Sequence, residues 1–214
     1  MAFLNPDDHY TFSAFFQLPY DIDEILAEFS YHYTQRRLTL PKDDRANPEA
    51  TALRSQIEAS LPYVQLSSEA AKREVLVAPV LLLVARLCRQ TLRFEYPLKV
   101  NNWLQGSLDY LLRSHGQIVV IAAKRDDLTR GFTQLAVEMI ALSMGEDAPP
   151  KIYGAVTIGS FWVFGCLDRE QRSITQDISG FRVPDDVEEL VAVLIGIIDY
   201  PSEDTPPTVK ESVR

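Results

Sequence analysis

The segment Leu104–Glu138 constrains the fold more than any other part of this chain of 214 residues. Within it, Gln117–Lys124 is almost continuously apolar, a pattern typical of a strand buried on both faces. The residues Ser114-His-Gly precede this run and predict a hairpin turn back to a strand over Leu104–Leu112. A helix is predicted over residues 129–144. Two strands joined by a hairpin and followed by a helix predict an α/β fold with a mixed sheet.

The whole chain divides into three predicted parts. Residues 1–66 form an N-terminal helical extension, residues 67–200 form the core with a C-terminal helix, and residues 201–214 form a polar, proline-rich and disordered tail. A long, buried helix is predicted over Ser67–Gln90, with a kink at Pro79. The other predicted core elements are strands over Leu92–Val100, Ile152–Ile158, Phe161–Leu167 and Arg172–Ile178, and a helix over residues 185–198.

Two helices are predicted in the extension. In the first, apolar residues recur at helical spacing. The second runs from Pro48 to Ser60 and has proline where helices often begin. The apolar residues that predict the first helix are Ile22, Ile25, Leu26, Phe29 and Tyr33.

The composition restricts the classes of partner and compartment. The net charge of −9 opposes tight binding to duplex phosphates, which depends on Lys and Arg, although it does not exclude a local basic groove. Cys88 and Cys166 are expected to be buried free thiols in a reducing compartment. The first residues have no basic region before an apolar run, and Val75–Leu87 is too short to span a bilayer. The sequence therefore predicts a cytoplasmic protein that does not enter membranes.

The predicted core has Asp109 on one strand, Lys124 at the end of the next strand and Gln134 on the helix that follows. In this arrangement, residues 67–178 resemble the PD-(D/E)XK, or restriction-endonuclease-like, superfamily. Residues 153–164, Tyr-Gly-Ala-Val-Thr-Ile-Gly-Ser-Phe-Trp-Val-Phe, are also similar to a Gly-x-x-Thr-x-Gly…Trp-x-Phe hairpin of a bacterial subfamily. The resemblance implies a site that holds Mg²⁺ and activates water for attack on a phosphodiester. By position, its residues are a helix Glu, a strand Asp, a strand-end Lys and a helix Gln: Glu74, Asp109, Lys124 and Gln134.

One departure from the family pattern is serious. Ala122 stands two residues before Lys124, where the family has a second acidic residue. Mg²⁺ prefers oxygen ligands in octahedral geometry, and only Asp109 and Glu74 remain as metal ligands. We therefore expect a catalytically inactive nuclease fold that binds no cofactor and acts as a binding or regulatory module. The alternative is a Mg²⁺-dependent DNA endonuclease in which Glu138 or Glu74 supplies the missing carboxylate.

Simpler interpretations compete with these roles. Lys124 fits a strand end exposed to water about equally well. Glu74 fits an ion pair with an arginine, such as Arg113 or Arg125, nearly as well as a ligand role. For Glu138, the polar face of a helix is the favoured interpretation, and Gln134 could belong to the same face.

The aromatic residues near the N-terminus predict packing within the protein or a contact with a protein partner, and a homodimer interface is a weaker alternative. They lack the interleaved Lys and Arg of a platform for stacking nucleic-acid bases. The three histidines are scattered and give no zinc pattern. The aromatic set is Phe3, Tyr10, Phe12, Phe15, Phe16 and Tyr20.

Overall fold

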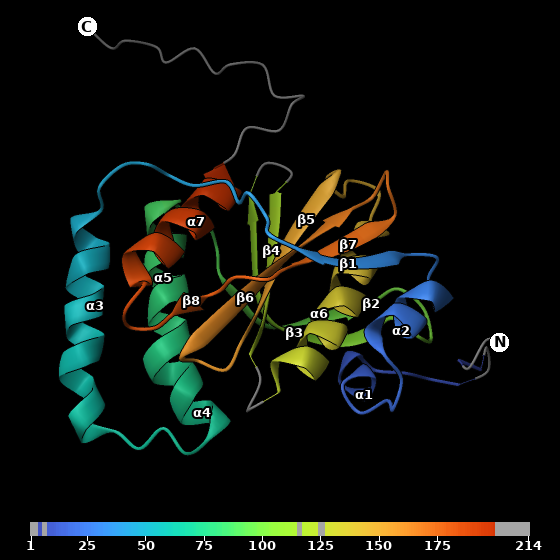
Figure 1. Ribbon diagram of the computed structural model, residues 1–214, viewed down its shortest axis with the longest axis horizontal. Coiled ribbons are helices and arrows are strands. Elements are labelled where there is room, and N and C mark those ends of the chain that lie inside the picture. Colours follow the sequence, from blue (N-terminus) through green and yellow to red (C-terminus); the bar gives the residue numbers. More distant parts are fainter. Residues whose placement is uncertain (1–3, 6–7, 115–116, 124–126, 200–214) are drawn as a thin grey trace, which may run out of the picture.

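The computed structural model describes residues 4–5, 8–114 and 127–199, and the backbone of residues 117–123. Its centre is an eight-stranded sheet with the order β1-β7-β6-β5-β4-β3-β2, and β8 pairs with β6 (Figure 1). The strands are β1 (His32–Arg36), β2 (Arg93–Lys99), β3 (Gln105–Ser114), β4 (Gln117–Ala123), β5 (Lys151–Thr157), β6 (Phe161–Asp168), β7 (Ser173–Asp177) and β8 (Phe181–Arg182).

Two groups of helices cover the two faces of this sheet (Figure 1). One face carries α3 (Pro48–Ser60), η1 (Leu61–Tyr63), α4 (Glu69–Lys72), η2 (Arg73–Val77), α5 (Ala78–Leu87) and α7 (Val187–Asp199). The other face carries α1 (Phe12–Phe15), α2 (Ile22–Glu28) and α6 (Leu128–Ser143). Each group has its own hydrophobic core, so the sheet is the middle of three layers.

The sheet is mixed, as the sequence predicts. The strands β2, β3 and β4 form an antiparallel meander, and β3 pairs with β4 up to Ser114 opposite Gln117. The helix α6 then crosses over to β5, which lies parallel to β4. This pairing confirms the predicted hairpin, although His115 and Gly116 at its turn lie outside the described residues.

The helix α6 is buried all round. Every residue from Gly131 to Ser143 is buried, because β4, β5 and β6 cover one side of the helix and α1 and α2 cover another. The hydroxyl oxygens of Tyr31 and Ser143 lie 3.1 Å apart and link the N-terminal region to the end of this helix. A helix enclosed in this way can place polar side chains deep inside the protein.

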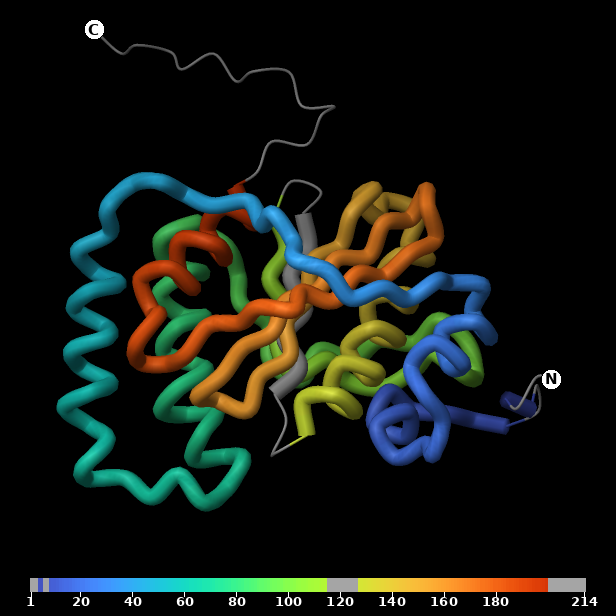
Figure 2. Tube along the Cα trace, viewed as in Figure 1, coloured from blue at the N-terminus to red at the C-terminus, as the bar shows by residue number. Residues whose placement is uncertain are grey.

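The N-terminal region is not purely helical, contrary to prediction. The helix α2 ends at Glu28, and Ser30 has a φ of +62°, which turns the chain. Tyr33, predicted on the first helix, instead lies in β1, which pairs in parallel with β7 at the edge of the sheet. Residues 8–66 cross from one helical layer to the other (Figure 2). The second predicted helix, α3, has the predicted bounds.

The long helix predicted over Ser67–Gln90 forms as three consecutive segments, α4, η2 and α5. Ser68 caps its start by accepting a hydrogen bond of 3.1 Å from the Ala71 amide. The middle segment, η2, is a π-helical turn directly before Pro79, and there the Ala78 amide donates to the Arg73 carbonyl. The π-helical turn therefore lies next to the position of the predicted kink.

Within the described residues, no helix combines the length and the apolar character needed to cross a membrane. The tail, residues 201–214, lies outside the described residues, so its predicted disorder stays a prediction.

Candidate functional site

Asp109, the central residue of the predicted site, lies on β3 next to the end of β4. The last pair of β3 with β4 is Tyr110 with Ile121, and Asp109 and Ala122 are the next residues of the two strands. Ala122 pairs in turn with Val156 of β5. The alanine at the position where the resemblance expects an acidic residue is thus one residue beyond the last β3–β4 pair, as Asp109 is on β3. Lys124 lies outside the described residues.

The side chains of β3 switch from one face of the sheet to the other at Asp109. Alternate residues of a regular strand share a face, yet Tyr110 belongs to the core under α5 and Leu108 to the core around α6. The pivot on β2 is Glu95, which has a φ of +46° and stands between the partners of Tyr110 and Leu108, opposite Asp109. Such local irregularities re-aim side chains and are frequent beside active sites.

Arg73 of η2 is the residue that the sequence interpretation missed. Its Nε donates to the hydroxyl of Tyr110 at 3.3 Å, and its Nη2 lies 2.9 Å from Oε1 of Glu95. The guanidinium carbon also lies 5.1 Å from the centre of the Tyr110 ring, in a cation–π contact. Arg73 thus binds the residue that follows Asp109 in β3 and the residue opposite Asp109 in β2.

The charges of this cluster act on one another. Burial alone would lower the pKa of Arg73, but the hydrogen bonds to Tyr110 and Glu95 and the negative charge of Asp109 raise the pKa above its ordinary value. Burial raises the pKa of the Tyr110 hydroxyl against the opposing effect of Arg73, and Asp109 and Glu74 raise it further. At neutral pH, the cluster therefore holds a charged guanidinium and a neutral phenol.

Glu74 is exposed and follows Arg73 in η2. Its charge contributes to the raised pKa of Tyr110, so it lies near the same cluster. The predicted helix Glu and strand Asp are thus in the same region of the fold, with Arg73 beside them.

Gln134 and Glu138 form a second polar group, inside α6. The Gln134 Nε2 donates a hydrogen bond of 2.7 Å to Glu138 Oε1. Gln134 is 4 % exposed and Glu138 is 0 % exposed, so the interpretation of a polar, solvated helix face is wrong. The outer helices α1 and α2 cover the face that would otherwise meet water, and the sequence of α6 alone does not reveal this.

The phase of α6 gives the direction of Glu138. A Cβ on Gly154 of β5 would lie 2.8 Å from Leu135 and 3.0 Å from Met139, so these two side chains face β5. Phe132 faces β6, because a Cβ on Gly165 would lie 2.5 Å from its ring. At about 100° per residue, Glu138 and Phe132 each lie roughly 60° around the helix axis from Leu135, on opposite sides of it. Because β4 lies on the side of β5 away from β6, Glu138 is directed toward β4.

The hairpin motif of the sequence has a structural role next to Arg73. The hydroxyl of Thr157 donates to the Phe161 carbonyl at 2.9 Å and accepts from the Gly159 amide at 2.9 Å. Gly159 has a φ of +90°, and a Cβ there would lie 3.0 Å from the Cβ of Lys72. The tight β5–β6 turn therefore seats the helix that carries Arg73.

The described side chains do not fit a Mg²⁺ site. Nowhere in the described part of the chain do three or more His, Cys, Asp or Glu side chains come close enough together to hold a metal ion. The carboxylate opposite Asp109 belongs to Glu95, and it is already bound to Arg73. A guanidinium among the carboxylates is the opposite of the electron-rich donor set that a hard cation requires.

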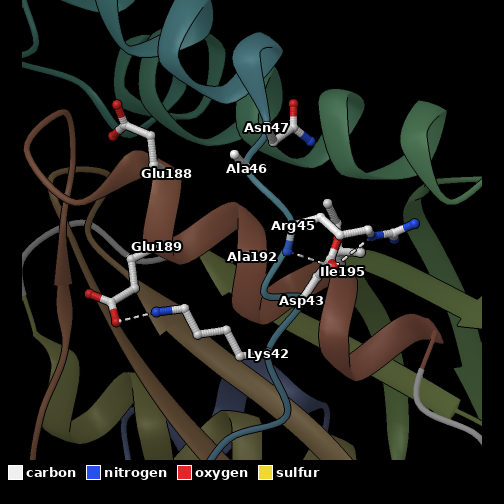
Figure 3. A pocket seen from close by; sticks show the side chains of 9 residues that line it. All are labelled: Lys42, Asp43, Arg45, Ala46, Asn47, Glu188, Glu189, Ala192 and Ile195. Atoms are coloured by element: carbon white, nitrogen blue, oxygen red, sulfur yellow. Dashed lines mark hydrogen bonds and ion pairs between the residues drawn. The ribbon is translucent and has the colours of Figure 1, made fainter.

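A separate cavity of about 330 Å³ lies between residues 42–47 and α7 (Figure 3). Two ion pairs lie in its lining: Lys42 is 2.9 Å from Glu189, and Arg45 is 2.7 Å from Asp43. A groove of about 580 Å³ between α3 and α5 has a largely apolar lining that includes the half-exposed Leu82. Neither hollow contains a residue of the predicted site.

Both cysteines are free and partly buried. Burial, reinforced by Asp199, raises the pKa of Cys88 to about 12, and burial raises the pKa of Cys166 to about 11. We expect iodoacetamide at pH 8 to alkylate Cys88 about a thousandfold more slowly in the folded protein than in urea, because the thiolate is the nucleophile. Mass spectrometry of the time course measures both rates. Equal rates in the two conditions would contradict the raised pKa.

The sequence-predicted residues thus fall into two groups. Asp109 and Glu74 lie around Arg73 at the β2–β3 pivot, while Gln134 and Glu138 form a buried pair in α6. No sequence signal distinguished Arg73 from the other arginines, because its role depends on the π-helical turn and on the pivot at Glu95. Comparison with known proteins finds no match to a protein-family model or to a curated protein.

Proposed function

We propose that this protein has a nuclease fold of the PD-(D/E)XK type that no longer hydrolyses phosphodiesters and acts as a binding or regulatory module. The topology supports the fold: an antiparallel meander β2–β3–β4, a crossover helix α6, and β5 parallel to β4. Asp109 on the second strand of the meander, with Lys124 just after the third, agrees with the family arrangement.

The observation that carries the proposed loss of activity is the alanine at position 122, which follows the last β3–β4 pair, Tyr110 with Ile121, just as Asp109 precedes it on β3. In a metal-dependent nuclease, two strand carboxylates bind the ion that activates water. With Ala122 in the acidic position of the family and a guanidinium bound to Tyr110 and Glu95, the strands offer one family carboxylate in a region that already holds a positive charge. We therefore propose no resident metal and no catalytic step at this site.

A nuclease assay tests this proposal. Purified protein is incubated with plasmid and single-stranded DNA in Mg²⁺ or Mn²⁺, with and without EDTA, beside the Asp109→Asn variant as the matched control. We expect wild type and variant to show the same background, because the wild type cannot hold the ion. Cleavage by the wild type that disappears both with EDTA and in Asp109→Asn would overturn the proposal.

The second candidate is an active Mg²⁺-dependent endonuclease in which Glu138 supplies the missing carboxylate. The burial of Glu138 and its direction toward β4 favour this candidate. If the assay detects metal-dependent cleavage, Glu138→Gln should abolish it. Glu74→Gln should leave most of it, because Glu74 is exposed on η2. The reverse pattern would assign the ligand role to Glu74 instead.

For the binding module, we propose a protein partner, because the net charge of −9 disfavours nucleic acid. Self-association through the N-terminal aromatic residues is a weaker proposal than the sequence suggests. Phe12 and Phe15 are each 1 % exposed and pack in the core around α6, while Tyr20 is 40 % exposed. Light scattering over a range of protein concentrations, with Tyr20→Ala as the comparison, measures whether that surface forms dimers.

A further inference from the structure

We infer that the outer edge of β1 is a docking surface that takes an acidic, extended segment of a protein partner as a further strand of the sheet. This surface, the β1 edge, consists of His32–Arg36 and the following Arg37. It lies at the opposite end of the sheet from β2 and β3, so the inference does not depend on whether the site around Asp109 is catalytic. It goes beyond the proposed function, because it gives the protein partner a chemistry and a place on the fold.

The first support is the direction of the backbone groups of β1. The His32 amide donates to the Arg172 carbonyl at 2.9 Å, at the start of the parallel pairing of β1 with β7. Alternate residues of a strand bond to the same neighbour, so the amides and carbonyls of Tyr33 and Gln35 point away from β7. Among the described residues, neither of these two has a backbone hydrogen bond outside the sheet. The β1 edge therefore presents the backbone groups that a further strand requires.

The second support is that β1 is exposed and yet held in place. All of its residues except Tyr33 are exposed. The Tyr33 ring centre lies 6.3 Å from that of Phe132 in α6, and the Tyr33 hydroxyl donates to Gln176 of β7. On the other face, the hydroxyl oxygens of Thr34 and Thr175 lie 3.1 Å apart. A strand fastened on both faces is already ordered, so it loses little conformational entropy when another strand joins it.

The two edges of the sheet differ in their capacity to accept a strand. On β2, the opposite edge, Pro97 has no amide hydrogen, and Glu95 with a φ of +46° interrupts the extended backbone. Both features oppose the addition of a strand. The β1 edge has neither a proline nor a residue with positive φ. Of the two edges, β1 is thus the one that can extend the sheet.

The charge of the β1 edge determines the kind of partner. Residues 29–42 contain no Asp or Glu, although the whole chain has a net charge of −9. Arg36 and Arg37 are both exposed, at the end of β1. Burial, together with the charge of Asp23, raises the pKa of Tyr33 against the effect of Gln35, so one carboxylate of α2 lies near the start of the strand. The β1 edge is therefore basic at its Arg36 end, and it complements an acidic segment.

A second copy of the chain fits the β1 edge less well than an acidic segment does. In an antiparallel pair of two β1 strands centred on Thr34, Arg36 of each copy would face His32 of the other. Neither strand would bring a carboxylate to the arginines. An extended segment with Glu or Asp at alternate positions instead places a carboxylate beside Arg36 while its backbone bonds to Tyr33 and Gln35.

A fluorescent peptide tests the inference on the full chain. The probe is a capped octapeptide that alternates Glu with Val and Thr, and its control has Lys in place of every Glu. Fluorescence polarisation should show saturable binding of the Glu peptide, roughly tenfold or more tighter than any binding of the Lys peptide. A rise in salt from about 50 mM to about 500 mM should weaken the binding severalfold, because salt screens exposed charges.

Two sets of variants separate the backbone pairing from the charge. Gln35→Pro removes an outward amide and leaves the amides that bond to β7, so the Glu peptide should bind roughly tenfold more weakly. Gln35→Ala keeps the amide and should bind within about twofold of wild type. Arg36→Gln combined with Arg37→Gln should weaken binding roughly threefold to tenfold. Arg54→Gln, on α3 in the opposite helical layer, is the charge control and should bind as wild type does.

Amide hydrogen exchange followed by NMR needs no variant. In the free protein, the amides of Tyr33 and Gln35 should exchange faster than those of Thr34 and Arg36, because only the latter bond to β7. A saturating amount of the Glu peptide should slow the exchange of Tyr33 and Gln35 about tenfold or more and leave the other two unchanged.

Several outcomes overturn the inference. It fails if the Glu peptide shows no saturable binding, because the arginines would then only protect a free edge from aggregation. It fails if folded Gln35→Pro binds the peptide as well as wild type does. If that variant does not fold, unchanged exchange of Tyr33 and Gln35 in the presence of the peptide decides against the inference.

Two further results would name a different occupant and also overturn the inference. Dimers that form with rising protein concentration and are lost in Gln35→Pro would make a second copy the occupant. Single-stranded DNA that displaces the peptide without slowing the exchange of Tyr33 and Gln35 would make the surface a basic patch rather than a strand edge. DNA cleavage and peptide binding are separate measurements, so the proposed function and this inference can fail independently.

Discussion

Replacing Gly165 with alanine is expected to lower the free energy of unfolding by about 2–3 kcal/mol, because the new methyl group overpacks the core. Gly165 lies on β6 directly under α6, and a Cβ there would lie 2.5 Å from the Phe132 ring and 3.3 Å from the Thr175 carbonyl. Phe132 is fully buried, so it has no free space into which to rotate. For a chain of this size, the melting temperature should fall by roughly 4–12 °C.

Gly145→Ala is the matched control for this prediction. A Cβ at Gly145, just beyond the end of α6, would meet its nearest atom, the Leu142 carbonyl oxygen, at 3.4 Å. We expect a change within about 0.5 kcal/mol, as for most surface substitutions. Denaturant unfolding followed by circular dichroism gives both values. Equal stability of the two variants would show that α6 does not pack on β6 as closely as the structure has it.

The order of the core elements was predictable because each carries a strong local signal. The apolar run of β4, the turn at Ser114 and the periodicity of α6 lie close together in the chain, and local patterns determine them. The strand β1 was missed because the apolar period of α2 continues numerically to Tyr33. The alternation from Tyr31, which is buried, through exposed His32 to partly buried Tyr33 was the available signal for a strand.

The candidate site was predictable only in part, because its residues come together through tertiary contacts. Family position indicated Asp109 and Ala122, and the described pairs of β3 with β4 end next to both residues, at Tyr110 and Ile121. Arg73 depended on a helical irregularity and on the pivot at Glu95, which no periodic pattern encodes. The burial of Glu138 depended on α1 and α2, which come from a distant part of the sequence.

Ala122→Glu is expected to create the metal response that the wild type lacks. Continued by one residue beyond Tyr110 and Ile121, the register of β3 and β4 brings position 122 opposite Asp109, so the variant is designed to bring a second carboxylate to the position that the family uses. Without metal, two neighbouring carboxylates repel each other, and we expect the variant to be less stable than wild type. With Mn²⁺, the ion binds both carboxylates and stabilises only the folded state.

The size of this effect follows from linkage. A ligand at a hundred times its dissociation constant adds about 2.7 kcal/mol to the stability of the state it binds, which corresponds to a rise in melting temperature of roughly 5–11 °C here. Ala122→Gln is the control, because it adds a similar volume without the charge and should not respond to Mn²⁺. The double variant with Asp109→Asn should also lose the response, because an ion at this site needs both strands.

The result distinguishes two explanations for the alanine. A response in Ala122→Glu that requires Asp109 means that the site kept its geometry and lost only a ligand, as the nuclease-fold proposal requires. A folded Ala122→Glu without a response, or with one that is independent of Asp109, would mean that β3 and β4 do not form an ancestral metal site. In that case the family resemblance of Asp109 and Lys124 would be coincidental.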